Sequence, residues 1–134
     1  MKIVNPEGFP PARGYSNGVV APAGRTLYVA GQVGWELDGS FASDDIAHQF
    51  GRALDHVLAV VAAEGGRAGH IAQMTIYVTD VAAYRDARKE LGRVWRERLG
   101  DHYPAMALVE VRALVEPRAR VEIQAVASVP GGEP

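Results

Sequence analysis

The sequence has 134 residues, of which 48% are hydrophobic and 22% are charged, and its formal net charge is −2. That length suits one compact domain, which buries roughly two thirds of the surface that its unfolded chain exposes. The chain contains no cysteine, which excludes a disulfide scaffold, a thiol nucleophile, a cysteine-ligated zinc site and an iron–sulfur cluster. Its 14 basic and 16 acidic residues nearly balance, so the overall charge provides no attraction to nucleic acid or to an anionic membrane.

The ends of the chain and its hydropathy predict where the protein acts. Residues 1–11 contain no apolar run of signal-peptide length. No stretch approaches the roughly 18 uninterrupted apolar residues of a membrane-spanning helix. We therefore expect a cytoplasmic protein with no membrane contact. Residues 1–134 are expected to form one domain, with a flexible arm over about 1–12 and a disordered tail over about 130–134, because both ends are rich in proline and glycine.

Taken in chain order, the first expected elements are two strands over 15–20 and 26–34. The intervening segment, 21–24, has the sequence Ala-Pro-Ala-Gly, which is typical of a hairpin connection. A helix is expected to begin at Asp44 or Asp45, acids that suit an N-cap, and to end at the glycine pair 65–66. Its apolar residues recur with a period near 3.6: Ile46, Phe50, Leu54, Val57, Leu58 and Val61.

The second half predicts a strand over 71–79, a helix from Asp80 to Gly100, and two strands over 106–114 and 118–129. The order β-β-α-β-α-β-β is that of an α+β sandwich with both helices packed on one face of a sheet. In the last strand, buried-type residues at 121, 123, 125 and 127 alternate with Glu122, Gln124, Val126 and Ser128, which point away from the helices. A face that is half apolar and carries polar groups suits a subunit interface, so we expect self-association.

No motif indicates a metal or a cofactor. Asp44 and His48 lie four residues apart on the first helix, but no HExxH or paired-histidine spacing accompanies them. The glycines form neither a P-loop nor a dinucleotide-binding turn, and no G-x-S-x-G nucleophile motif is present. We expect no metal site and no cofactor.

The second helix carries six basic residues, which raises the question of RNA binding. Acidic residues stand one turn away, as in the pairs Glu90–Arg93 and Arg93–Glu97, so the two charges neutralise one another. No exposed aromatic row accompanies them for stacking against bases. We therefore expect a solvated helix face and no nucleic-acid partner.

Glu122 is a candidate catalytic residue because of the residues that surround it in the last predicted strand. It lies between Val121 and Ile123 in an apolar strand, and an acid in that setting is costly unless it faces a cleft or is paired. A partly buried carboxyl at a cleft is suited to proton transfer. The alternative is a salt bridge to Arg112 or Arg120, and the residues alone leave both open.

Several segments together resemble the RidA (YjgF/YER057c/UK114) family of enamine/imine deaminases. The similarity runs from about residue 10 to 128, in the expected order and spacing. The matching segments are Gly14-Tyr15-Ser16-Asn17, Leu27 to Val33, Ala53 to Leu58 with the glycine pair 65–66, Met74 to Asp80, Tyr103-Pro104-Ala105 and Val121 to Ala127.

The resemblance implies a chorismate-mutase-like subunit in a homotrimer with a central barrel and three clefts between subunits. In the deaminase branch, a strand arginine directly after Tyr-Pro-Ala binds the substrate carboxylate, while a glutamate and a tyrosine help to position water and substrate. By the same resemblance, Glu122 and Tyr15 match the catalytic glutamate and tyrosine. Gly31 and Gln32 match the Gly-Gln of a Ser-Gly-Gln strand, in which Ala30 replaces the serine.

Two departures from the family pattern concern substrate binding. Met106 occupies the arginine position, and Arg88 stands where deaminases often have asparagine. Methionine cannot pair with a carboxylate. No nearby residue is identified as a replacement, although a neighbouring subunit could supply one. Arg112 is expected on the same strand face as Met106, but about 20 Å further along.

The resulting expectation is a small-molecule hydrolase of the imine or enamine deaminase type, acting at clefts between subunits. The expected substrate is not a standard 2-imino acid, because Met106 replaces the arginine. The alternative is a non-catalytic trimer that binds a small ligand or a protein partner in the same clefts. A weaker alternative is an endoribonuclease-like activity.

Overall fold

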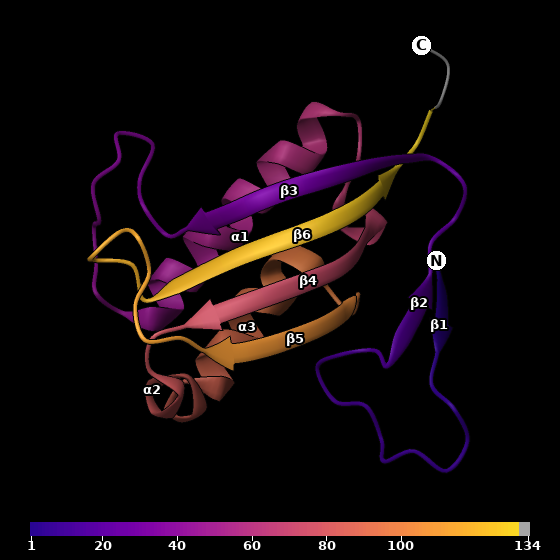
Figure 1. The fold of residues 1–134 in the computed structure, drawn as a ribbon, viewed down its shortest axis with the longest axis horizontal. Coiled ribbons are helices and arrows are strands. Elements are labelled where there is room, and N and C mark those ends of the chain that lie inside the picture. The colour runs from indigo at the N-terminus through magenta and orange to yellow at the C-terminus, as the bar shows by residue number, and fades with distance from the viewer. Residues whose placement is uncertain (132–134) are drawn as a thin grey trace.

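The computed structural model describes residues 1–131, which form a mixed sheet covered by helices on one face (Figure 1). The main sheet has the strand order β3-β6-β4-β5. The elements are β1 (Lys2–Val4), β2 (Gly18–Val20), β3 (Arg25–Val33), α1 (Ile46–Ala63), the 3-10 turn η1 (Ala68–His70), β4 (Ile71–Val78), α2 (Val81–Asp86), α3 (Arg88–Leu99), β5 (Ala105–Glu110) and β6 (Val121–Val129). The predicted fold class is confirmed.

Helix α1 begins and ends where the sequence predicts. The carboxylate of Asp45 accepts a hydrogen bond from the backbone N–H of His48 at 2.9 Å and so caps the first turn. At the other end, Gly65 adopts a φ of +77°, the left-handed conformation that terminates many helices. The apolar stripe of the helix is buried against the sheet, and Leu54 and Val57 have no exposed surface.

The second predicted helix is divided into α2 and α3 at Ala87. Asp80 caps α2 as expected, because its side chain accepts from the N–H of Ala83 at 3.0 Å. Both helices belong to the crossover between β4 and β5, which pair in parallel. A parallel pair needs such a crossover, and its helices cover one face of the sheet. The division at Ala87 places a helix end beside the edge strand β5.

Strand β6 lies at the centre of the sheet and shows the expected alternation. Val121, Ile123, Ala125, Ala127 and Val129 are all buried in the core beneath the helices. The residues between them are half-buried or exposed. The strand begins at 121, not 118, and β5 ends at 110, not 114. Arg112 therefore lies in the loop after β5 and does not share a strand face with Met106, which corrects that expectation.

The predicted hairpin between 15–20 and 26–34 is wrong. Strand β2 pairs with β1 in a separate two-stranded sheet, and β3 pairs with β6 (Figure 1). The segment expected to be a flexible arm, about 1–12, contains β1 at Lys2–Val4. Short apolar runs flanked by proline and glycine do not reveal which strand they pair with, and here the chain's first residues supply the partner.

The C-terminal tail expected over about 130–134 falls partly on residues 132–134, which lie outside the described residues. Pro130 is held by contact with the fold, because its carbonyl accepts a hydrogen bond from Arg25 at 3.3 Å. The order that the structure describes therefore extends beyond the end of β6.

Candidate functional site

The segment after the N-terminal strand is attached to the beginning of β5. Ser16 makes a β-bridge with Ala105, and its N–H donates to the carbonyl of Pro104 at 3.2 Å. Its hydroxyl donates to the carbonyl of Tyr103 at 2.6 Å. These contacts place Tyr15 beside the edge strand, where its side chain is 40% exposed. Tyr15 and Met106 both line a hollow of about 260 Å³ at this edge.

On the helix-covered face, Met106 also lines a larger cavity of about 340 Å³ between α3 and the edge of the sheet. Its walls are largely aromatic. The rings of Trp95 and Tyr103 are stacked, with centroids 5.8 Å apart and planes 3° from parallel. Phe50 lies behind Trp95, with ring centroids 6.5 Å apart. The indole N–H of Trp95 donates to the carbonyl of His102 at 3.2 Å, which fixes the ring.

The mouth of the same cavity contains two guanidinium groups from α3, those of Arg88 and Arg96. Arg88 and Met106, both expected from the sequence to contact substrate, line one cavity of one chain. The side chain of Arg88 is oriented by a hydrogen bond from its Nε to the carbonyl of Arg85 at 3.2 Å.

Tyr84, which belongs to α2 and lines this cavity, has a phenol whose pKa is shifted. Burial raises the pKa of Tyr84 above its ordinary value, and the positive charge of Arg88 acts in the opposite direction. The hydroxyl of Tyr84 is protonated at neutral pH, as that of an ordinary tyrosine is, and the raised pKa extends this state to more alkaline pH.

The second group of predicted residues lies on the opposite face of the sheet, around Glu122. The strand pairing of β3 with β6 contains a β-bulge between Val29 and Gln32. Ala30 and Gly31 form this bulge, and the amide of Gln32 donates to the carbonyl of Ala30 at 3.1 Å. Bulges recur beside functional sites because they change the direction of neighbouring side chains.

The carboxylate of Glu122 lies directly over Gly31. A Cβ atom on Gly31 would stand 2.6 Å from Glu122 Oε2 and 2.7 Å from its Cδ, so any side chain at position 31 would displace the carboxylate. Neither salt-bridge partner considered for Glu122 contacts it in the described residues: Arg120 pairs with Asp80 at 3.6 Å, and Arg112 lies in the loop after β5. The polar neighbourhood continues on this face with the hydrogen bond from the hydroxyl of Tyr77 to Gln124 at 2.7 Å.

The predicted site residues thus form two half-sites within one chain. The first, which we call the edge half-site, contains Tyr15, Arg88 and Met106, and the second contains Glu122 with the bulge 30–32. Met106 pairs with Met74 on the buried face, whereas Glu122 pairs with Tyr77, three residues along β4 and on the other face. The two half-sites are therefore separated by roughly 10 Å along the strands and by the thickness of the sheet.

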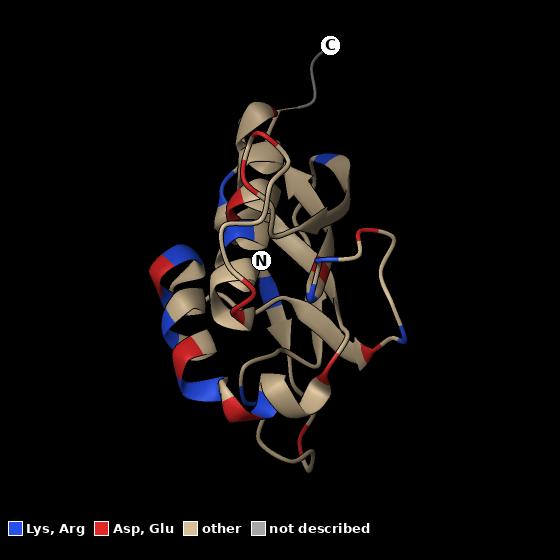
Figure 2. Ribbon diagram, turned by 90° about the vertical axis from the view of Figure 1, so that its left-hand side faces the viewer, with Lys and Arg blue, Asp and Glu red and all other residues tan. Residues whose placement is uncertain are grey.

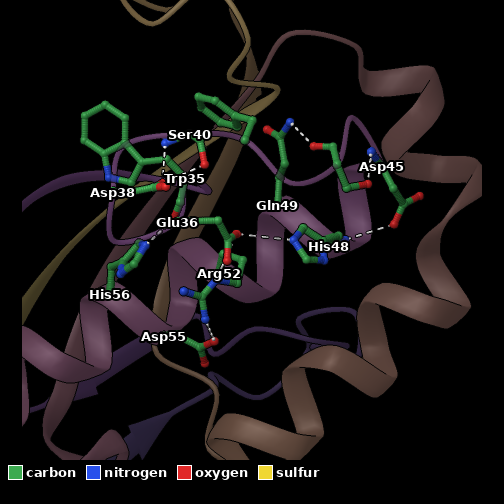
Figure 3. Close-up of polar contacts among 12 residues, drawn as sticks. Trp35, Glu36, Asp38, Ser40, Asp45, His48, Gln49, Arg52, Asp55 and His56 are labelled. Carbon is green, nitrogen blue, oxygen red and sulfur yellow. Dashed lines mark hydrogen bonds and ion pairs between the residues drawn. The ribbon is translucent and has the colours of Figure 1, made fainter.

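Another polar cluster lies between α1 and the loop that follows β3, and its contacts are structural (Figure 3). Glu36 lies 3.3 Å from Arg52 and 3.5 Å from His48. The ring of His56 contacts the carbonyl of Trp35 at 2.7 Å. Within residues 1–131, no three histidine, aspartate or glutamate side chains are grouped closely enough to hold a metal ion.

The basic residues of the second helical segment are partly neutralised, as the sequence predicts. Arg93 forms ion pairs with Glu90 and Glu97, and the hydrogen bond from Arg93 holds the pKa of Glu90 below its usual value. Arg98 reaches across to α1 and pairs with Asp55 at 2.7 Å. Figure 2 shows acidic and basic residues interspersed along the helices. Among residues 1–131, no ion pair involves Arg88 or Arg96, nor Arg85 or Lys89 nearby, and Arg88 donates to a backbone carbonyl.

Sequence reasoning missed most of the cavity wall. Tyr84, Trp95 and Arg96 all lie in the segment predicted as the second helix, and none of them was identified as a site residue. The available signal was spacing: Arg88, Gly92 and Arg96 are four residues apart and share one side of a helix with Tyr84 and Trp95 close by. Nothing in one sequence indicates that this side faces a cavity.

The strand order and the covering helices define a mixed α/β protein of the YjgF/Rid class. Residues 7–129 match the family described as Endoribonuclease L-PSP. The chain therefore belongs to this family, to which the RidA and YjgF proteins also belong. The resemblance inferred from the sequence is confirmed.

Individual relatives cover nearly the whole chain. Protein DfrA of Myxococcus xanthus is 32% identical over 131 residues, which cover 94% of each protein. The 2-iminobutanoate/2-iminopropanoate deaminase of Escherichia coli (strain K12) is 29% identical over 127 residues, covering 94% of this chain and 96% of the enzyme. The crystal structure of the Rid-family protein YyfB from Yersinia pestis is similar with a TM-score of 0.86 at 26% identity, covering 96% of this chain and 98% of that one.

Among residues 1–131, no helix combines the length and the apolar character that crossing a bilayer requires.

Proposed function

We propose that this protein is a small-molecule hydrolase that adds water to a C=N bond and releases ammonia. The observation that carries the proposal is the carboxylate of Glu122, which lies over Gly31 at a β-bulge on the face of the sheet away from the helices. The family includes an enzyme named 2-iminobutanoate/2-iminopropanoate deaminase, whose name describes this chemistry. We place the reaction in the cytoplasm, as the sequence predicts.

In the proposed reaction, Glu122 is the acid and base. Its carboxylate accepts a proton from water while the water oxygen bonds to the imine carbon, and then gives that proton to the imine nitrogen. The carboxylate next takes the hydroxyl proton of the carbinolamine and gives it to the amino group, so the C–N bond breaks and ammonia leaves as the carbonyl forms. The overall balance is one imine and one water giving one carbonyl compound and one ammonia. Positioned proton transfer of this kind contributes about 100- to 10,000-fold to a rate.

The proposed unit is a homotrimer with clefts between subunits. Within one chain Glu122 and Met106 lie on opposite faces of the sheet, so a single chain does not bring Glu122 to the cavity that Met106 and Arg88 line. A cleft that joins the edge half-site of one copy to Glu122 of the next would do so. The half-apolar outer face, which includes the 77% exposed Tyr28, supports an interface there.

The substrate is proposed to differ from the short 2-imino acids, because Met106 has no charge with which to bind their carboxylate. The same observation favours a second candidate function, a trimer that binds its ligand in these clefts without turning it over. The two are distinguished by whether ammonia is released.

The test is ammonia release from a panel of imines generated in solution from their amino acids, with the wild type, Glu122→Gln and Gln124→Ala compared. We expect Glu122→Gln to lose at least 100-fold in rate, because the amide cannot accept the proton. Gln124→Ala, on the same strand and face, should stay within about twofold, since it has no place in the proton transfer. Equal rates for the wild type and Glu122→Gln would contradict the mechanism.

Two further measurements complete the test. Met106→Arg is expected to raise turnover of 2-iminopropanoate, because it restores the guanidinium at the strand position. Light scattering should give a mass three times that of one chain. A monomer that releases ammonia would refute the shared cleft, and ligand binding without any ammonia release would support the second candidate.

A further inference from the structure

Three residues of α3 form a row along the cavity, with Gly92 midway between Arg88 and Arg96. Residues four apart on a helix are neighbours, and a long side chain leans toward the N-terminal end of its helix. Arg96 therefore extends over Gly92 in the direction of Arg88. The contact is close, because a Cβ on Gly92 would lie 3.1 Å from Arg96 Nη1. Because position 92 has no side chain, the guanidinium of Arg96 lies against the helix between its own position and that of Arg88.

The charges of this row are not neutralised within the described chain. Elsewhere on α3, Arg93 pairs with Glu90 and Glu97, and Arg98 pairs with Asp55. Arg88 donates its Nε to a backbone carbonyl, and no ion pair or other hydrogen bond involves the terminal nitrogens of Arg88 or Arg96 among residues 1–131. Two guanidinium groups at one cavity mouth, with donors still available, are suited to a bidentate anion such as a carboxylate.

Behind the row the cavity is apolar. The stacked rings of Trp95 and Tyr103 form one wall, and Phe50, Leu91 and Met106 contribute to the rest. At about 340 Å³, the cavity has the size of a small-ligand site. A ligand that satisfies both regions carries an anion at one end and an apolar or aromatic body at the other.

The geometry points to a carboxylate-binding site in which Arg88 and Arg96 take over, from helix α3, the role of the missing strand arginine. The ligand class is a carboxylate with an aromatic or branched apolar body, held between the guanidinium row and the Trp95–Tyr103 wall. Met106 then contacts the apolar body of the ligand. This inference deepens the proposed function and rests on it for the reaction, since the ligand would be the imine of such an acid.

The test measures binding alone, by isothermal titration calorimetry with 3-phenylpropanoate, its neutral amide and propanoate as probes. We expect the wild type to bind 3-phenylpropanoate most tightly of the three. Arg88→Ala and Arg96→Ala should each weaken that binding by about 10- to 100-fold, the usual effect of losing a charged hydrogen bond, and Arg88→Lys should lose less. The amide should bind weakly and be insensitive to Arg88→Ala.

The matched control is Arg85→Ala, which removes the same charge from α2 outside the cavity lining and should leave binding within about twofold. The inference is overturned if Arg88→Ala binds like the wild type, if Arg85→Ala weakens binding as much as Arg88→Ala does, or if 3-phenylpropanoate does not bind. Its failure is distinct from failure of the proposed function. If ammonia release depends on Glu122 but its KM is unaffected by Arg88→Ala, the carboxylate-binding site is refuted and the proposed hydrolase activity is retained.

Discussion

Replacing Gly31 by alanine separates the role of Glu122 from the stability of the fold. The added Cβ would lie 2.6 Å from Glu122 Oε2 and 2.7 Å from Cδ, so the carboxylate must move. The displaced atoms are the end of a flexible side chain, and Gly31 does not have a positive φ, so alanine fits the backbone. Moving the side chain off its rotamer costs about 0.5–1.5 kcal/mol, and the reduced freedom of the unfolded chain returns about 0.4–1 kcal/mol.

The two contributions nearly cancel, so the free energy of unfolding of Gly31→Ala should stay within about 1 kcal/mol of the wild type. The rate of ammonia release should nevertheless fall by about 100-fold or more, because a displaced carboxylate no longer reaches the attacking water. The assays are thermal unfolding and ammonia release from the imine on which the wild type is most active.

Gly34→Ala is the matched control. Its Cβ would lie 2.3 Å from the carbonyl oxygen of Gln49 and 2.5 Å from that residue's Cα, both backbone atoms of α1. The backbone of α1 cannot move aside as a side chain does. We therefore expect Gly34→Ala to lower the free energy of unfolding by about 3 kcal/mol and the Tm by roughly 10 °C. The reasoning is refuted if Gly31→Ala keeps the wild-type rate with its carboxylate displaced in a crystal structure, or if it lowers the Tm as much as Gly34→Ala does.

Two other predictions concern buried groups. The side chain of Gln49 is fully buried; its amide donates to the carbonyls of Ser43 and Arg118 and accepts from the N–H of Arg120. Gln49→Leu should therefore lower the free energy of unfolding, measured by denaturant titration, by about 3–5 kcal/mol. A decrease below about 1 kcal/mol would show that these hydrogen bonds are dispensable. Burial raises the pKa of Tyr84 above its ordinary 10.0, so the folded protein keeps a proton that the unfolded chain loses, and stability should decline as the pH rises past that value. Tyr84→Phe should remove the part of this decline in the free energy of unfolding that comes from the phenol. Identical curves of stability against pH for the wild type and Tyr84→Phe would contradict this prediction.

The elements that the sequence predicted correctly are those with long, regular patterns. Helix α1 has a continuous apolar stripe and a capping acid at Asp45, and β6 has strict alternation around Glu122, so each pattern alone specifies the element. The pairing of β2 was not predictable, because three residues carry no register information and their partner β1 lies in a segment that reads as an arm. The division of the second helix at Ala87 has no proline or glycine to mark it.

The candidate site residues remain predictions. Glu122 was identified from its strand pattern and from the family pattern, and Tyr15 from the family pattern alone. The bulge at Ala30 and Gly31 adds one residue to one strand, which is visible only when the partner strand is known. Arg96 was missed because a run of charges on a helix is usually solvated, and only the tertiary packing distinguishes the side that faces a cavity from the side that faces water.

The parallel pairing of β4 with β5 has a consequence for how this protein could change its ligand. The connection between them contains α2, α3 and the turn into β5, so Tyr84, Arg88, Trp95, Tyr103 and Met106 belong to one uninterrupted stretch of chain. Glu122 comes from a strand outside it. An exchange of residues 81–106 between relatives would therefore transfer most of the residues that line the cavity, though not Gly14, Phe50 or Ile76, in one segment. The carboxylate to which we assign proton transfer would stay in place, so ligand preference would change independently of the proposed chemistry.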